Sequence, residues 1–65
     1  MCEANVYILD ENGREQLILD SVDRITPTDD GLVLESIFSE KKLLKAVSIK
    51  EMTLVDHRIL LERIG

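Results

Sequence analysis

The residues with the clearest capacity for chemistry are the first two, Met1 and Cys2. Cys2 is the only cysteine in the chain, so an internal disulfide is excluded. The Met1 amine, the Cys2 amide nitrogen and the Cys2 thiolate follow one another closely, and a metal bound to all three closes two five-membered chelate rings. A deprotonated amide binds metals that prefer square-planar coordination, chiefly Ni(II) and Cu(II). Met1 and Cys2 are therefore the candidate metal ligands.

A complete site of this kind calls for a second chain. One chain supplies at most three such donors, whereas two chains across a twofold axis supply two thiolates and two nitrogens at one site. Loss of Met1 would leave each chain one nitrogen and one sulfur, which still permits a four-coordinate site. Twofold dimers are the commonest closed oligomers, and a chain of 65 residues is near the lower limit for folding alone. We therefore expect a homodimer.

The remaining candidates for chemistry have simpler structural interpretations. Cys2 itself can be a small apolar residue of the first strand, although chain termini usually stay near solvent. His57 with Cys2 suggests a thiol–imidazole pair, but nothing in the sequence orients them, and we interpret His57 as a turn residue beside Asp56. The carboxylates of Asp10 and Asp30 lie in predicted turns, where aspartate suits the local backbone. The sequence therefore predicts a protein that is not an enzyme.

Composition excludes several classes of partner. The net charge is −5, with 13 acidic and 8 basic residues, and aromatic residues make up 3% of the chain. Nucleic-acid binding relies on Lys and Arg at phosphates and on aromatic rings that stack on bases, so a nucleic-acid partner is disfavoured. No stretch approaches the ~18 apolar residues of a membrane span, and no signal peptide is apparent. A single free cysteine then favours the cytoplasm.

Alternating hydrophobicity predicts a single all-β domain over residues 1–65. Asn12-Gly13 is a strong hairpin signal, and Pro27 marks the end of a strand. Ser39 can cap a short helix in residues 39–46, but we favour a loop and a short strand there. The apolar parity changes between Ile49 and Met52, which predicts a bulge. The predicted strands cover residues 2–9, 14–19, 22–28, 32–38, 47–55 and 58–64, with a break at residues 20–21.

About six short strands joined by tight turns predict a small antiparallel barrel, because closure removes exposed sheet edges. In the strand 32–38, Leu32, Leu34 and Phe38 share one side. The last strand has apolar residues at both parities, including Leu60 and Leu61. We therefore expect one face of that strand to contact the core and the other to contact a partner subunit.

The chain resembles the CooT family over essentially its whole length. The resemblance rests on the sequence MCEANVY at residues 1–7, on Asn12-Gly13, on residues 22–27 and on the apolar segment 55–61. It implies a homodimeric small barrel of the SH3-like or Sm-like type, in which Cys2 binds Ni(II). It also implies a link to carbon monoxide dehydrogenase maturation, with that enzyme or its maturation proteins as partners.

Two other functions remain open at this stage. Members of the same family are also labelled as predicted RNA-binding proteins, so a small RNA-binding barrel is one alternative. A structural interaction module without metal is the other, and it predicts that Cys2→Ser is silent while Leu60→Asp disrupts assembly.

Overall fold

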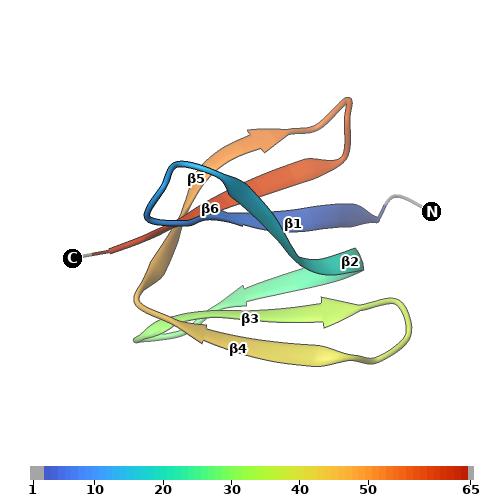
Figure 1. Cartoon of the computed structure of the whole chain (residues 1–65). Coiled ribbons are helices and arrows are strands. Elements are labelled where there is room, and N and C mark those ends of the chain that lie inside the picture. Colours follow the sequence, from blue (N-terminus) through green and yellow to red (C-terminus); the bar gives the residue numbers. More distant parts are fainter. Residues whose placement is uncertain (1–2, 65) are drawn as a thin grey trace.

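Six β-strands pair into one sheet in the part of the chain that the computed structural model describes, residues 3–64. They are β1 (Ala4–Leu9), β2 (Glu15–Pro27), β3 (Gly31–Ser36), β4 (Lys41–Lys45), β5 (Val47–Thr53) and β6 (Arg58–Arg63). Their order across the sheet is β4-β3-β2-β1-β6-β5 (Figure 1). The predicted all-β class and the number of strands are confirmed. Residues 3–64 include no helix that is long and apolar enough to span a membrane.

The hairpin between β1 and β2 forms at the predicted Asn12-Gly13 turn. Gly13 has a φ of 80°, a conformation that glycine adopts without a steric penalty. The Asp10 carboxylate accepts hydrogen bonds from the backbone nitrogens of Asn12 and Arg14, at 2.8 and 2.9 Å, and from the Gln16 side chain at 3.0 Å. These bonds, that of Arg14 foremost, hold the pKa of Asp10 below its ordinary value.

Strand β2 is one continuous strand of 13 residues, where the sequence predicted two strands and a break at Asp20-Ser21. Ser21 has a φ of 55°, and the pairing register shifts near it against both neighbouring strands. The first part of β2 pairs with β1, and the last part pairs with β3. The residues that indicated a break therefore form a bend, which allows one strand to serve both halves of the sheet.

The β3–β4 hairpin settles the ambiguous segment 39–46 in favour of strand. The buried Ser36 hydroxyl accepts hydrogen bonds from the backbone nitrogens of Phe38 and Glu40, both at 3.1 Å, and these bonds hold the turn that leads into β4. Strand β3 ends at Ser36, two residues before the predicted end. Phe38 consequently lies in the turn and is 69% exposed, so its expected place beside Leu32 and Leu34 is wrong.

The passage from β4 to β5 explains why the predicted antiparallel barrel is wrong. Only Ala46 separates the two strands, and it lies between Asp30 and Ile64: its nitrogen donates to the Asp30 carbonyl at 2.7 Å, and its carbonyl accepts from Ile64 at 2.8 Å. The strand pairings require β4 and β5 to run in the same direction. The chain therefore bends at Ala46 without reversing.

Two consequences follow from this bend. Strand β6, which reverses once more after β5, lies parallel to β1. Strands β4 and β5 follow each other end to end, so they do not pair side by side. Within residues 3–64 the six strands thus form an open, bent sheet rather than a closed barrel.

The core lies on the inner face of the bent sheet. Val6 and Ile8 lie two positions apart in β1 and therefore on one face of that strand, and both are buried there. Burying an aliphatic side chain of this size contributes about 1.5–3 kcal/mol. The predicted bulge in β5 is confirmed as a register shift between Ile49 and Glu51. The buried apolar residues are Val6, Ile8, Leu19, Val22, Leu32, Leu34, Val47 and Leu61.

Candidate functional site

The predicted metal ligands Met1 and Cys2 lie outside the residues that the structure describes. The description begins at Glu3, and strand β1 begins at Ala4. Within residues 3–64, no group of three or more His, Cys, Asp and Glu side chains is placed to hold a metal ion. That part of the chain therefore offers no rival cluster, and the surroundings of the first strand define the candidate site.

Three segments meet at the end of the sheet where β1 begins (Figure 1). The Asn5 nitrogen donates a hydrogen bond to the His57 carbonyl at 2.9 Å, which attaches the β5–β6 turn. The Asn5 side-chain oxygen accepts a bond of 3.4 Å from the Ser21 nitrogen in the bend of β2. The Ser21 carbonyl in turn accepts from Ile37 at 2.8 Å, which attaches the β3–β4 turn. The first strand therefore emerges between two hairpin turns.

Both of these turns present large apolar side chains to solvent. Phe38 of the β3–β4 turn is 69% exposed, and Leu54 and Val55 of the β5–β6 turn are 75% and 89% exposed. Turns usually carry Gly, Pro, Asn, Asp and Ser, and apolar groups gathered on a surface mark interaction sites. We call these three residues the apolar tips. Sequence reasoning missed them because it extended both strands over them, although an apolar pair directly before Asp56-His57 was a usable signal.

His57 occupies the turn that was predicted for it, although the turn is longer than expected and β5 ends at Thr53. The φ of His57 is 54°, and its nitrogen donates to the Leu54 carbonyl at 3.3 Å. Its side chain is exposed. The structural interpretation of His57 as a turn residue is confirmed, and its backbone also joins the turn to the first strand.

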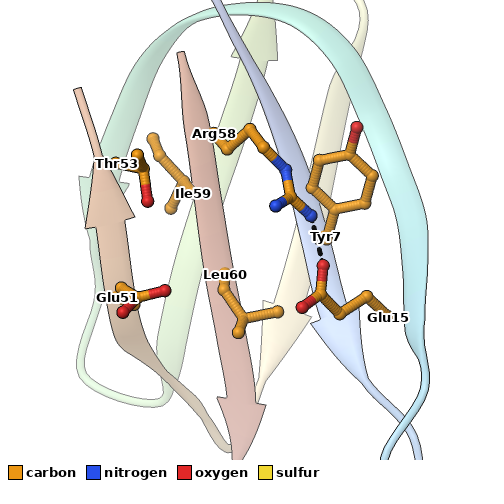
Figure 2. Close-up of a pocket in the computed structure, with 7 residues that line it drawn as sticks. All are labelled: Tyr7, Glu15, Glu51, Thr53, Arg58, Ile59 and Leu60. Carbon is orange, nitrogen blue, oxygen red and sulfur yellow. Dashed lines mark hydrogen bonds and ion pairs between the residues drawn. The ribbon is translucent and has the colours of Figure 1, made fainter. Parts of the chain in front are cut away.

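A second group of polar residues lies on the outer face of the sheet, where three strands meet (Figure 2). The Arg58 guanidinium lies 4.6 Å from the centre of the Tyr7 ring and forms an ion pair with Glu15. The hydrogen bond and the charge of Glu15 raise the pKa of Arg58 above its ordinary value. Sequence reasoning missed this group, since Glu15 and Arg58 are 43 residues apart and no local pattern connects them.

The hollow beside this group is too small to be a ligand site. Its volume is about 10 Å³, which is space for about one water molecule. Leu60, which the sequence assigned to a face that contacts a partner, pairs with Tyr7 across β1 and β6 and lines this hollow. The Arg58 group therefore fastens β6 to β1 and β2. The lining residues are Tyr7, Glu15, Glu51, Thr53, Arg58, Ile59 and Leu60.

Comparison with known proteins supplies the family. The family model described as CO dehydrogenase accessory protein CooT matches residues 1–62. A crystal structure from Carboxydothermus hydrogenoformans, provisionally assigned to CooT, is similar with a TM-score of 0.87 and 47% sequence identity. The match covers 98% of this chain and 100% of that chain. No curated protein matches the chain. Because the family match includes the first two residues and nearly the whole sheet, the chain belongs to the CooT family of CO dehydrogenase accessory proteins.

Proposed function

We propose that this protein is a nickel-binding accessory protein that acts in the cytoplasm in the maturation of carbon monoxide dehydrogenase. In this proposal it is a homodimer, related to SH3-like domains, and Cys2 binds Ni(II) where two chains meet. The observation that carries the proposal is the Met1-Cys2 pair at the start of a chain that matches the CooT family over residues 1–62.

The donor atoms of Met1 and Cys2 fit Ni(II). A thiolate is a strong ligand, and amine and deprotonated amide nitrogens complete a square-planar set, the geometry typical of Ni(II) and Cu(II). Nickel is here a cargo rather than a resident cofactor, so the protein's task is to bind the ion and release it to a recipient. The thiol and the amide must lose protons on binding, so affinity falls as the pH is lowered.

The surroundings of the first strand support a dimer at this end of the sheet. The apolar tips Phe38, Leu54 and Val55 are 69–89% exposed and lie in the two turns beside the start of β1 (Figure 1). A second copy placed there about a twofold axis covers the same tips on both chains. Such a contact also brings the starts of the two β1 strands toward one another, and in this proposal the two Cys2 thiolates then bind one nickel ion.

The test is nickel titration of the wild-type chain and of Cys2→Ser, followed by absorption spectroscopy. We expect a thiolate-to-nickel charge-transfer band in the wild type, with one nickel ion per two chains, and its loss in Cys2→Ser. Lys50→Ser, at the exposed bulge of β5, is the matched control and should titrate like the wild type. Equal affinity and an unchanged band in Cys2→Ser would refute the proposal.

A further inference from the structure

We propose that the outer edge of strand β4 (Lys41–Lys45) binds an extended acidic segment of a partner protein, which adds a further strand to the sheet. The interaction is independent of the proposed nickel site, because it rests on strands β3 and β4 alone. It is carried by the open backbone of this edge, by its regular pairing with β3 and by the positive charge gathered on it.

Strand β4 is an edge strand with backbone groups that face away from the sheet. In the part of the chain that the structure describes, it pairs with β3 on one side and with no strand on the other (Figure 1). The Ser36 nitrogen donates to the Glu40 carbonyl at 2.8 Å, and the Ala46 nitrogen donates to the Asp30 carbonyl at 2.7 Å. In an antiparallel ladder, hydrogen-bonded pairs alternate with pairs whose backbone groups point away from the partner strand. The residues of β4 with outward-pointing backbone groups are therefore Lys41, Leu43 and Lys45.

The opposite edge of the sheet, strand β5, is less suited to an added strand. Its pairing with β6 shifts between Ile49 and Glu51, and such a bulge bends the edge and interrupts regular pairing. Strand β4, in contrast, pairs with β3 in unbroken register from Lys41 to Lys45. Strand β5 also contains one lysine and one glutamate, so its charges cancel. Strand β4 is therefore the edge that offers a regular template.

Positive charge is concentrated on β4 although the chain as a whole is acidic. Lys41, Lys42 and Lys45 are all exposed, whereas the net charge of the chain is −5. No ion pair among residues 3–64 involves these lysines. Glu35, which is the register partner of Lys41, instead forms an ion pair with Arg24 at 3.9 Å. The edge therefore presents charge that the carboxylates of a partner can neutralise.

The order of residues in β4 selects the partner. A second copy paired antiparallel about Leu43 places Lys41 opposite Lys45, and like charges directly opposite are destabilising, which is a common protection of sheet edges by lysine. Acidic residues at the same positions are attracted instead, and the added strand gains backbone hydrogen bonds. Leu43, which is 61% exposed, and the half-buried Leu44 call for apolar residues between the acids. An antiparallel partner segment therefore reads acidic, apolar, apolar, acidic, acidic.

The experiment measures the binding of a fluorescein-labelled peptide to the full chain by fluorescence anisotropy. The central residues of the peptide are glutamate, valine, valine, glutamate and glutamate. One control peptide has lysine in place of glutamate, and another is methylated on the backbone nitrogens that would bond to β4. Lys45→Glu reverses one charge of the edge, and Lys50→Glu is the matched control, because Lys50 is also exposed but lies in β5. Leu43→Pro removes an outward-pointing donor and no ladder bond, and circular dichroism checks that each variant is folded.

We expect the wild type to bind the glutamate peptide and neither control peptide, with an affinity that falls as salt screens the charges. Lys45→Glu should bind on the order of tenfold more weakly, since an attraction between strands becomes a repulsion. Leu43→Pro should also bind more weakly, whereas Lys50→Glu and Cys2→Ser should bind as the wild type does.

Three results would overturn the inference. The first is a wild-type chain that does not bind the glutamate peptide, and the second is an equal loss of binding in Lys45→Glu and Lys50→Glu. The third is equal binding of the methylated peptide, or of a short single-stranded RNA of the same charge, which would show a general anion-binding surface rather than strand addition. If Leu43→Pro does not fold, the charge variants and the methylated peptide still decide. The nickel proposal is unaffected by each of these results, because its test depends on Cys2.

Discussion

Replacement of Val55 by serine gives a quantitative test of the apolar tips as a dimer contact. Val55 is 89% exposed, so nearly all of its side chain is available for burial by a second copy. Full burial of a side chain of this class contributes about 1.5–3 kcal/mol. Because only the exposed 89% of Val55 is newly buried on association, its contribution to the free energy of dimerisation is about 1.3–2.7 kcal/mol per chain. A twofold interface buries two copies, and the loss is therefore about 3–5 kcal/mol per dimer when both are fully covered.

At about 1.4 kcal/mol per tenfold, this loss weakens dimerisation by roughly a hundredfold to several thousandfold. Sedimentation velocity over a range of protein concentrations measures the dimer dissociation constant directly. Leu43→Ser is the matched control, because Leu43 is 61% exposed and lies within β4 rather than at either tip. Folding of the Val55→Ser monomer should be unaffected, since exposed substitutions usually change stability by less than about 0.5 kcal/mol. A dissociation constant that is unchanged in Val55→Ser, or changed equally in Leu43→Ser, would refute this assignment of the interface.

Three further predictions address the core, the first turn and the metal site. Leu34 is fully buried, so Leu34→Ala should lower the free energy of unfolding by about 2.7–5 kcal/mol, whereas Leu43→Ala should lower it by less than about 0.5 kcal/mol. Urea titration at one protein concentration, followed by circular dichroism, measures both changes. Equal losses of stability in the two variants would contradict the burial of Leu34. Because hydrogen bonds lower the pKa of Asp10 in the folded chain from 3.8, its contribution to stability is present above that value and is lost as the pH falls through the folded-state pKa. Asp10→Ala should accordingly be less stable than the wild type in urea at pH 7, with a smaller difference at pH 3, and a difference that does not depend on pH would argue against the role of the carboxylate. Nickel affinity in the wild type should fall as the pH is lowered, since the Cys2 thiol must lose its proton. Calorimetry at several pH values, in buffers of different ionisation enthalpy, should detect the release of protons on binding. Binding without proton release would exclude a thiolate ligand.

Local signals in the sequence were sufficient to predict most of the strands. The Asn12-Gly13 turn, the alternation around Val6 and Ile8 and the parity change in β5 each depend on neighbouring residues, and each is present in the structure. A hairpin turn or a bulge is decided mainly by residues within a few positions of it, so a single sequence can predict it.

Whether the sheet closes into a barrel could not be predicted from neighbouring residues alone. The sequence predicted an antiparallel barrel, but Ser21 and Ala46 are bends with positive φ, 55° and 57°. Because the chain bends at Ala46 without reversing, β4 and β5 run in the same direction, and β6 consequently lies parallel to β1. Serine and alanine carry no strong signal for positive φ, so the sequence could not distinguish a bend from a turn at these positions.

The candidate site likewise has a part that local sequence reveals and a part that it does not. Met1 and Cys2 were recognisable because their donor atoms are contiguous in the sequence. The segments beside the start of β1 were not, because the β5–β6 turn at His57 and the β3–β4 turn at Ile37 reach it only through backbone bonds to Asn5 and to the bend in β2. A residue that approaches a site through sheet pairing is invisible to spacing rules, and the structure is required to find it.

The position of β1 bears on the metal site proposed at Met1 and Cys2. Strand β1 is paired on both sides, with β2 and with β6, so the sheet holds the chain from Ala4 onward. Ordering one residue costs about 1–2 kcal/mol. In the proposed function, binding at Cys2 therefore requires little ordering of the chain beyond that which the central strand already supplies.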